Sequence, residues 1–230
     1  MLKRTLEPEL MDTLEDARQY NRMDHADVNR QFVVDLIAFA SQCQSDGYDG
    51  LATDVVDLGT GTALVPIELC RRVDSVQVLA IDDAVNMLDL AIYNIEAANL
   101  RDRITLAKGD AKSLVYEDET FDTTISNSLI HHSPVPEQCF AQMHRVTASG
   151  GLLFVRDLVR PNSDAMARQL VQQYAQGATD YCKRLFLDSF HAALTIDEVR
   201  QFVGDLGYNS QTVTMSSDRH WTWAAIKPGG

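Results

Sequence analysis

Short apolar runs alternate with longer amphipathic segments between residues 54 and 160 of the chain. The runs are rich in β-branched residues and apolar on both faces, which is typical of parallel strands covered by helices on each side. They span residues 55–58, 76–81, 104–107, 121–125 and 152–155. This strand–helix alternation predicts right-handed crossovers and a doubly wound α/β sheet.

The segments on either side of this region follow different patterns. Ahead of it, residues 8–45 are predicted helical, with apolar positions spaced by four and three. After it, residues 162–178 and 180–194 are also predicted helical, and Thr195–Glu198 (TIDE) forms a capping box that opens a short helix. Two strand-like segments, 210–215 and 221–226, predict an antiparallel hairpin that closes one edge of the sheet, which makes the sheet mostly parallel and seven-stranded.

The length of 230 residues favours one domain with additions over two domains. We therefore expect a single domain over residues 1–230. It comprises a helical lead-in or lid (1–50), a ligand-binding core (51–160), and a helical insertion with the C-terminal hairpin (161–230).

Charge and composition indicate which classes of binding partner are expected. Lys and Arg number 20 against 33 Asp and Glu, a net charge of −13, and no basic stripe is present, so nucleic acid is not an expected partner. The first residues lack the apolar stretch of a signal peptide, and no apolar run approaches the ~18 residues of a membrane helix. We expect a cytoplasmic protein that does not bind membranes and acts on a small molecule; a homodimer is left open.

The four cysteines offer no metal-binding pattern. They stand at positions 43, 70, 139 and 182, and no CxxC occurs. The sequence therefore lacks the usual motif of a zinc site or of a thioredoxin-type redox centre, and it predicts no metal site.

The first apolar run leads into a glycine-rich turn, DLGTGTA (57–63). Parallel sheets bind ligands at the carboxyl ends of their strands. Gly59 and Gly61 allow a tight turn and close ligand approach, and the helix that follows presents free amides. A GxGxxG dinucleotide loop needs a small residue at position 64, where this chain has Leu64, so the pattern argues against a nicotinamide cofactor.

Acidic residues follow the next two runs. A carboxylate at Asp82 could accept both hydroxyls of a ribose, and Asp110 could accept the amino group of a base. For Asp83, an acid favoured by a helix dipole is the alternative, and for Asp110 a simple turn aspartate.

Residues 54–161 together resemble the class I S-adenosylmethionine-dependent methyltransferases, and within them the small-molecule enzymes of menaquinone and ubiquinone biosynthesis. The segments that carry the resemblance are DLGTGTA, AIDDAVNML (80–88), KGDAKSL (108–114), SNSLIHHSPVP (126–136) and RVTASGGLLFVRD (145–157). The resemblance implies a Rossmann-like fold, S-adenosyl-L-methionine as cofactor and S-adenosyl-L-homocysteine as product. It departs from that subgroup beyond Arg160.

The same resemblance assigns the cofactor contacts. The glycine turn would hold the methionine moiety, Asp82 the ribose, and Asp110 with Ala111 the adenine edge; Asn127 would either contact cofactor or fix its own loop. The full set of cofactor-binding candidates is Asp57, Gly59, Thr60, Gly61, Asp82, Asp83, Met87, Asp110, Ala111 and Asn127.

Catalytic candidates are few, because transfer of a sulfonium methyl group depends on positioning and a water-poor site rather than on a protein nucleophile. His131 and His132 follow the fourth run and would supply an optional base if the acceptor carries a proton. A loop histidine bonded to backbone is the alternative for each.

Substrate contacts are expected from two places. Tyr20, Arg22 and His25 precede a helix that lies over the cofactor in related methyltransferases, although helix capping is the alternative reading there. Arg156 and Asp157 follow the fifth run, and arginine suits an anionic acceptor.

Three rival functions remain open. A non-catalytic S-adenosylmethionine-binding or regulatory protein would bind the cofactor without turnover. A nicotinamide-dependent oxidoreductase is disfavoured by Leu64 and by the lack of a Tyr-x-x-x-Lys pair. A nucleic-acid methyltransferase is disfavoured by the negative charge and by the absence of an (N/D)PP(Y/F) pattern between Ser126 and His132.

Overall fold

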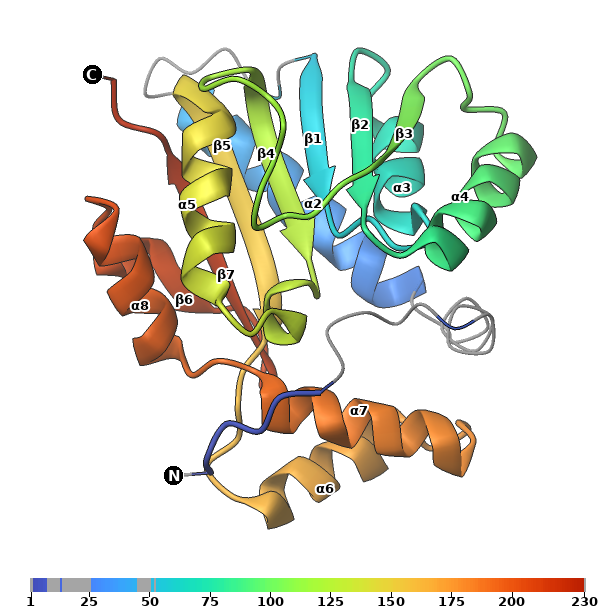
Figure 1. Ribbon diagram of the computed structural model, residues 1–230, viewed down its shortest axis with the longest axis vertical. Coiled ribbons are helices and arrows are strands. Elements are labelled where there is room, and N and C mark those ends of the chain that lie inside the picture. Colours follow the sequence, from blue (N-terminus) through green and yellow to red (C-terminus); the bar gives the residue numbers. More distant parts are fainter. Residues whose placement is uncertain (1, 8–12, 14–25, 45–50, 52, 230) are drawn as a thin grey trace.

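The computed structural model describes residues 2–7, 13, 26–44, 51 and 53–229. A seven-stranded sheet runs through its centre in the order β3-β2-β1-β4-β5-β7-β6 (Figure 1). The strands are β1 Asp54–Leu58, β2 Gln77–Asp82, β3 Ile104–Lys108, β4 Phe121–Asn127, β5 Thr147–Leu158, β6 Val213–Met215 and β7 His220–Ile226. The strands from β3 to β5 are parallel, and β7 pairs antiparallel with both β5 and β6. The predicted doubly wound sheet with an antiparallel edge pair is confirmed.

Helices cover both faces of this sheet (Figure 1). They are α2 Ala26–Gln44, α3 Leu64–Arg72, α4 Val85–Ala97, α5 Pro136–Val146, α6 Asp164–Tyr174, α7 Asp180–Ala192 and α8 Ile196–Asp205, with short 3₁₀ turns η1 Ile130–His132 and η2 Ser210–Thr212. Side chains of α5 and α8 pack on one face, where Phe140 and Val203 are fully buried. Side chains of α2, α3 and α4 pack on the other, around Phe32 and Leu69. Two apolar cores thus hold the parallel strands between helical layers, as their apolar faces require.

Local chemistry sets several element ends. The predicted capping box is present: the Thr195 hydroxyl accepts from the Glu198 amide, and the Glu198 carboxylate accepts from the Thr195 amide at 2.7 Å. The predicted strand over 210–215 is wrong in its first half, because the Asn209 carbonyl oxygen of the side chain accepts from the Gln211 amide and closes η2 there.

Two other expectations need adjustment. Strand β3 is an edge strand in which only Ile104 is buried, so it is not buried on both faces as predicted. Of the helix predicted over 8–45, the described part is α2, and residues 8–12 and 14–25 lie outside the described residues.

The N-terminal residues 2–7 run along α7 beside the carboxyl end of the sheet (Figure 1). The Thr5 amide donates to the His191 carbonyl at 2.9 Å. The Arg4 guanidinium donates to the carbonyls of Ala192 at 2.7 Å and of Ser133 at 2.8 Å. These bonds tie the segment to both α7 and the turn that follows β4. Among the helices of the described residues, none has the length and apolar character needed to cross a membrane.

Candidate active site

A cleft opens at the carboxyl ends of the strands, beside the point between β1 and β4 where the order of the strands reverses. Doubly wound sheets bind their ligands at this position. The cleft is lined by Gly59, Gly61, Asp82, Asp83, Ala84, Met87, Gly109, Asp110, Ala111, Lys112, Asn127, Ser128, Leu129, His132, Ser133 and Cys139.

The glycine turn after β1 forms one wall of the cleft. The amides of Gly59 and Thr60 donate to the Ile81 carbonyl at 2.9 and 3.0 Å, which ties the turn to β2. Gly59 has a φ of +73°, and a Cβ atom there would lie 2.7 Å from Cδ1 of Leu129. Only glycine meets both conditions without strain, so this position needs the residue that the sequence has.

The Asp82 carboxylate joins the glycine turn to the start of α4. One carboxylate oxygen accepts from the Gly61 amide at 2.7 Å, and the other accepts from the Ala84 amide at 2.9 Å. Burial raises the pKa of Asp82, and these two amides oppose that rise. A carboxylate has about four acceptor sites, so Asp82 keeps capacity for ligand hydroxyls while its position is held by the backbone.

Asp57 lies behind the turn, at 2% exposure. Burial raises its pKa to about 7, the neighbouring Thr60 hydroxyl lowers it, and the charge of Asp82 raises it further. Near neutral pH this carboxyl is therefore divided between its protonated and ionised forms, and it is sensitive to any charge brought into the cleft.

Two further acids on the cleft wall have lysine partners. Asp83 pairs with Lys108 at 3.0 Å in a largely exposed contact. Asp110 accepts from both the amide and the Nζ atom of Lys112 at 2.8 Å. Burial would raise the pKa of Asp110, but the hydrogen bonds and charge of Lys112 outweigh it and lower the pKa. Asp110 is therefore ionised in the neutral range.

The fit of the cleft to a nucleoside with an amino-acid tail rests on these groups and on one unsatisfied atom. The side-chain oxygen of Asn127 is buried in the cleft wall and has no hydrogen-bond partner within the described residues. Unsatisfied buried polar atoms are unusual, and one that borders a cleft has room to bind a ligand there. Together with the Gly59 turn and the acceptor capacity of Asp82, this atom makes the cleft suited to S-adenosylmethionine.

The two histidines after β4 lie in η1 but have different surroundings. His131 is buried at 4% exposure, and its Nδ1 atom lies 2.6 Å from Asp157 Oδ1 while its amide donates to Asp157 Oδ2 at 3.0 Å. His132 is less buried and lines the cleft, and the two rings are tilted with centroids 4.2 Å apart. Of the two, His132 is therefore the one placed to meet a ligand.

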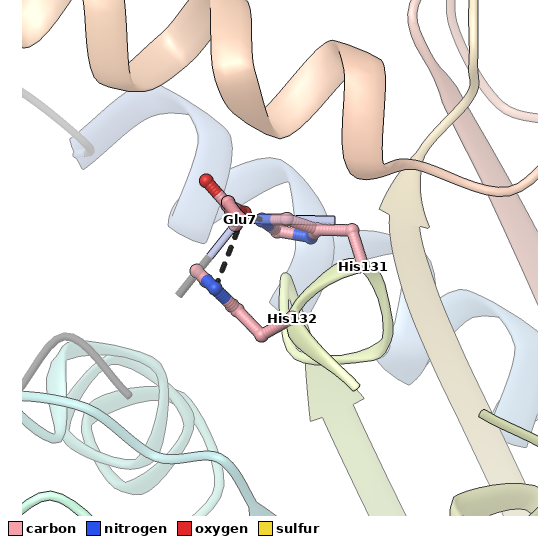
Figure 2. Close-up of side chains that lie close together, drawn as sticks. All are labelled: Glu7, His131 and His132. Carbon is pink, nitrogen blue, oxygen red and sulfur yellow. Dashed lines mark ion pairs between the residues drawn. The ribbon is translucent and has the colours of Figure 1, made fainter. Parts of the chain in front are cut away.

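Glu7 faces both imidazoles from the N-terminal segment (Figure 2). Its Oε1 atom lies 3.4 Å from His131 Nε2 and 3.2 Å from His132 Nδ1. Burial lowers the pKa of His131, but the charges of Asp157 and Glu7 outweigh this and raise it. Burial raises the pKa of Glu7. Burial would also raise the pKa of Asp157, but the charge and hydrogen bond of His131 outweigh it and lower that pKa.

The structure brings most of the predicted cofactor residues to one place. The predicted residues that line the cleft are Gly59, Gly61, Asp82, Asp83, Met87, Asp110, Ala111 and Asn127. Asp57 and Thr60 are buried and are not part of the lining. Their contacts with cofactor remain predictions.

The substrate candidates are placed less favourably. The Arg156 guanidinium donates to Asp35 Oδ2 and to the Thr222 hydroxyl, both at 2.7 Å, and is buried outside the cleft lining. Asp157 is buried against His131. Tyr20, Arg22 and His25 lie outside the described residues. A substrate contact for any of these five remains a prediction.

Sequence reasoning missed several residues of the site. Lys112 lies two residues after Asp110, and Leu129 lies two residues before His131, so both stand in segments that the motifs had already identified. Their position at the cleft could therefore have been predicted from their sequence neighbours. Glu7 had none, because it comes from a segment far away in the sequence.

Comparison with known proteins agrees with this geometry. A family model described as "Methyltransferase domain" matches residues 56–155. The matched residues make up less than half of the chain and contain strands β2 to β4, most of β1 and β5, and the glycine turn, so this part of the chain is similar to a methyltransferase domain.

Individual relatives are similar over parts of their length. The release factor glutamine methyltransferase of Rhodopirellula baltica is 36% identical over 73 residues, which cover 32% of this chain and 25% of that protein. The demethylmenaquinone methyltransferase of Porphyromonas gingivalis is 32% identical over 111 residues, which cover 47% of this chain and 45% of that protein. The chain thus spans less than half the length of either relative.

A similar fold is found in a solved S-adenosylmethionine-dependent methyltransferase from Aquifex aeolicus. The two structures superpose with a TM-score of 0.62 at 16% sequence identity, and the superposition covers 93% of this chain and 98% of the other. At this identity the likeness concerns the fold.

Proposed function

We propose that this protein transfers the methyl group of S-adenosylmethionine to a small-molecule acceptor and releases S-adenosylhomocysteine. The observation that carries the proposal is the Asp82 carboxylate, which two backbone amides hold at the cleft rim beside the Gly59 turn. The match to the methyltransferase domain and the similarity to a demethylmenaquinone methyltransferase support the reaction class and an acceptor of small size.

The cofactor would supply an activated methyl group, and the residues of the chain would bind and orient it. Asp82 would accept the ribose hydroxyls, Asp110 and Ala111 would contact the adenine, and the Gly59 turn would lie against the methionine moiety. Asn127 would use its unsatisfied side-chain oxygen as an acceptor for the cofactor. Such positioning supplies several kcal/mol of a displacement barrier, roughly in line with the effective molarities of oriented reactants.

On the acceptor side, His132 and Ser133 line the cleft. If the acceptor carries a proton, the His132 imidazole would take it, because His131 is buried and its Nδ1 atom is engaged by Asp157. An acceptor without such a proton would need no base, since the site then acts by orientation and exclusion of water.

Two measurements test this proposal. Calorimetric titration of the full chain with S-adenosylhomocysteine should show one site per chain, and absence of both heat and a thermal shift at millimolar ligand would reject cofactor binding. Mass spectrometry of an acceptor panel of quinols, phenols and small carboxylic acids should then detect a gain of one methyl group. Binding without any methylated product over a broad panel would instead support a cofactor-binding or regulatory protein.

A further inference from the structure

Three potential metal ligands converge beside the cofactor cleft. They are Glu7 from the N-terminal segment and the adjacent His131 and His132 from η1 (Figure 2). One ligand atom from each, the Glu7 Oε1, His131 Nε2 and His132 Nδ1 atoms, lies within 4.8 Å of the other two. Two imidazoles and a carboxylate form the donor set of many zinc sites.

The distances suit a tetrahedral ion. Glu7 Oε1 lies 3.4 Å from His131 Nε2 and 3.2 Å from His132 Nδ1. With metal–ligand bonds of about 2.0–2.1 Å, two ligands at the tetrahedral angle stand about 3.3 Å apart. Both contacts therefore have the spacing of neighbouring ligands on one ion.

A second, independent observation is the state of the Glu7 carboxylate. Its side chain is only 7% exposed, and its Oε1 atom has no hydrogen-bond partner within the described residues. The other oxygen, Oε2, accepts from the Ser189 hydroxyl at 3.3 Å, so Oε1 is the atom turned to the histidines. A buried carboxylate oxygen in this condition is placed to bind a cation.

The surroundings of His131 also match those of a metal ligand. Asp157 Oδ1 lies 2.6 Å from His131 Nδ1, and Asp157 is held in turn by the amides of His131 and Leu158. Metal-bound histidines commonly donate their second ring N–H to a carboxylate, which fixes the tautomer. Here that bond leaves Nε2 with its lone pair on the side of Glu7.

We propose that Glu7, His131 and His132 bind one divalent transition-metal ion of the zinc type, with Asp157 orienting His131. Three protein ligands leave a fourth position open, as in catalytic rather than structural zinc sites. Because His132 also lines the cofactor cleft, the ion would lie next to the place where the methyl acceptor is expected. With the ion bound, His132 would be a ligand and could not take a proton from the acceptor. The ion would instead polarise an acceptor oxygen. Mixed nitrogen and oxygen donors favour Zn²⁺ over Mg²⁺.

The competing explanation is a metal-free ion pair in which a protonated His131 bridges Asp157 and Glu7. The two explanations differ in whether the chain retains metal. Untagged full-length protein is stripped with a chelator, dialysed, and titrated with Zn²⁺, with bound metal measured by elemental analysis. Co²⁺ serves as a parallel probe, because a tetrahedral site gives intense visible absorption. We expect one Zn²⁺ per chain, tetrahedral Co²⁺ bands and no comparable retention of Mg²⁺.

Variants locate the site. Glu7→Gln and His132→Ala should each abolish stoichiometric Zn²⁺ binding, whereas Asp157→Asn should weaken it by about 10- to 100-fold, as other substitutions behind a metal ligand do. His144→Ala is the matched control, because His144 bonds to the Tyr208 hydroxyl on another part of the molecule. Far-UV circular dichroism checks that each variant is folded.

Two results would overturn the proposal. One is a wild-type chain that retains no Zn²⁺ at micromolar metal. The other is Zn²⁺ retained equally by wild type, Glu7→Gln and His132→Ala. Because metal content is measured without cofactor or acceptor, neither result depends on the proposed methyl transfer.

Discussion

Replacing Gly59 with alanine tests whether the glycine turn is shaped by its contact with the segment after β4. Two effects act on the new methyl group. The φ of +73° is a left-handed conformation that disfavours a side chain, and the Cβ atom would lie 2.7 and 2.8 Å from Cδ1 and Cβ of Leu129. Gly150 separates the two effects, because its φ is +76° but a Cβ atom there would meet nothing within 4 Å.

The magnitudes follow from this difference. A left-handed backbone costs about 1–2 kcal/mol for an alanine, so Gly150→Ala should lower the free energy of unfolding by that amount. Overpacking adds about 1–3 kcal/mol, so Gly59→Ala should lower it by about 2–5 kcal/mol. Trimming Leu129 to alanine removes the clash but not the backbone strain. The double-mutant cycle of Gly59→Ala with Leu129→Ala should therefore give a coupling of about 1–3 kcal/mol.

The assay is urea unfolding followed by far-UV circular dichroism for the two glycine variants, Leu129→Ala and the double variant. The reasoning is refuted if Gly59→Ala is no more destabilised than Gly150→Ala. It is refuted equally if the cycle shows no coupling with Leu129, because the close contact would then have no energetic weight.

Three further predictions concern buried carboxylates. Asp82→Asn should weaken S-adenosylhomocysteine binding by about 1–3 kcal/mol, roughly 5- to 150-fold by calorimetry, while Glu68→Gln outside the cleft should not; equal affinities would contradict the role of Asp82. The pKa of Asp57 is raised from 3.8 to about 7, so wild-type stability falls as pH rises between these values. Between pH 4 and pH 8, the free energy of unfolding of Asp57→Asn should therefore rise by up to about 4 kcal/mol relative to that of wild type. If urea unfolding gave the same difference between the two proteins at every pH, this prediction would be wrong. In the metal-free chain, Asp157→Asn should lower the free energy of unfolding by about 3–5 kcal/mol near pH 5 and by less at alkaline pH. The pKa of His131 is raised, so its ion pair with Asp157 weakens as pH rises through that pKa. A loss of stability that grows with pH would argue against the pair.

The parallel part of the fold is predictable because its signals are local. Each apolar run marks a strand within a few residues, and the Thr195 capping box contains its own hydrogen-bond partners. The polar residues at the strand ends, such as Asp82 and Asp110, then come together because parallel strands end at the same edge of the sheet.

The remaining features depend on contacts between distant segments. No local pattern places Glu7 against His131, since the pairing requires both β5 and α7 to be in position. The hydrogen-bond partners of Arg156 could not be predicted either, because Asp35 and Thr222 belong to α2 and β7, which are distant from Arg156 in the sequence. For the same reason the sequence predicted no metal site: it offered no cysteine motif, and the three candidate ligands are not contiguous.

Strand β7 contains both tryptophans of the chain, Trp221 and Trp223, and each is fully buried. The strand lies between β5 and β6, on the opposite side of β4 from the glycine turn. Intrinsic fluorescence of this protein is therefore a reporter of the antiparallel end of the sheet. Emission that shifts at a lower urea concentration than the circular dichroism signal would mean that this end unfolds before the half of the sheet that borders the cleft.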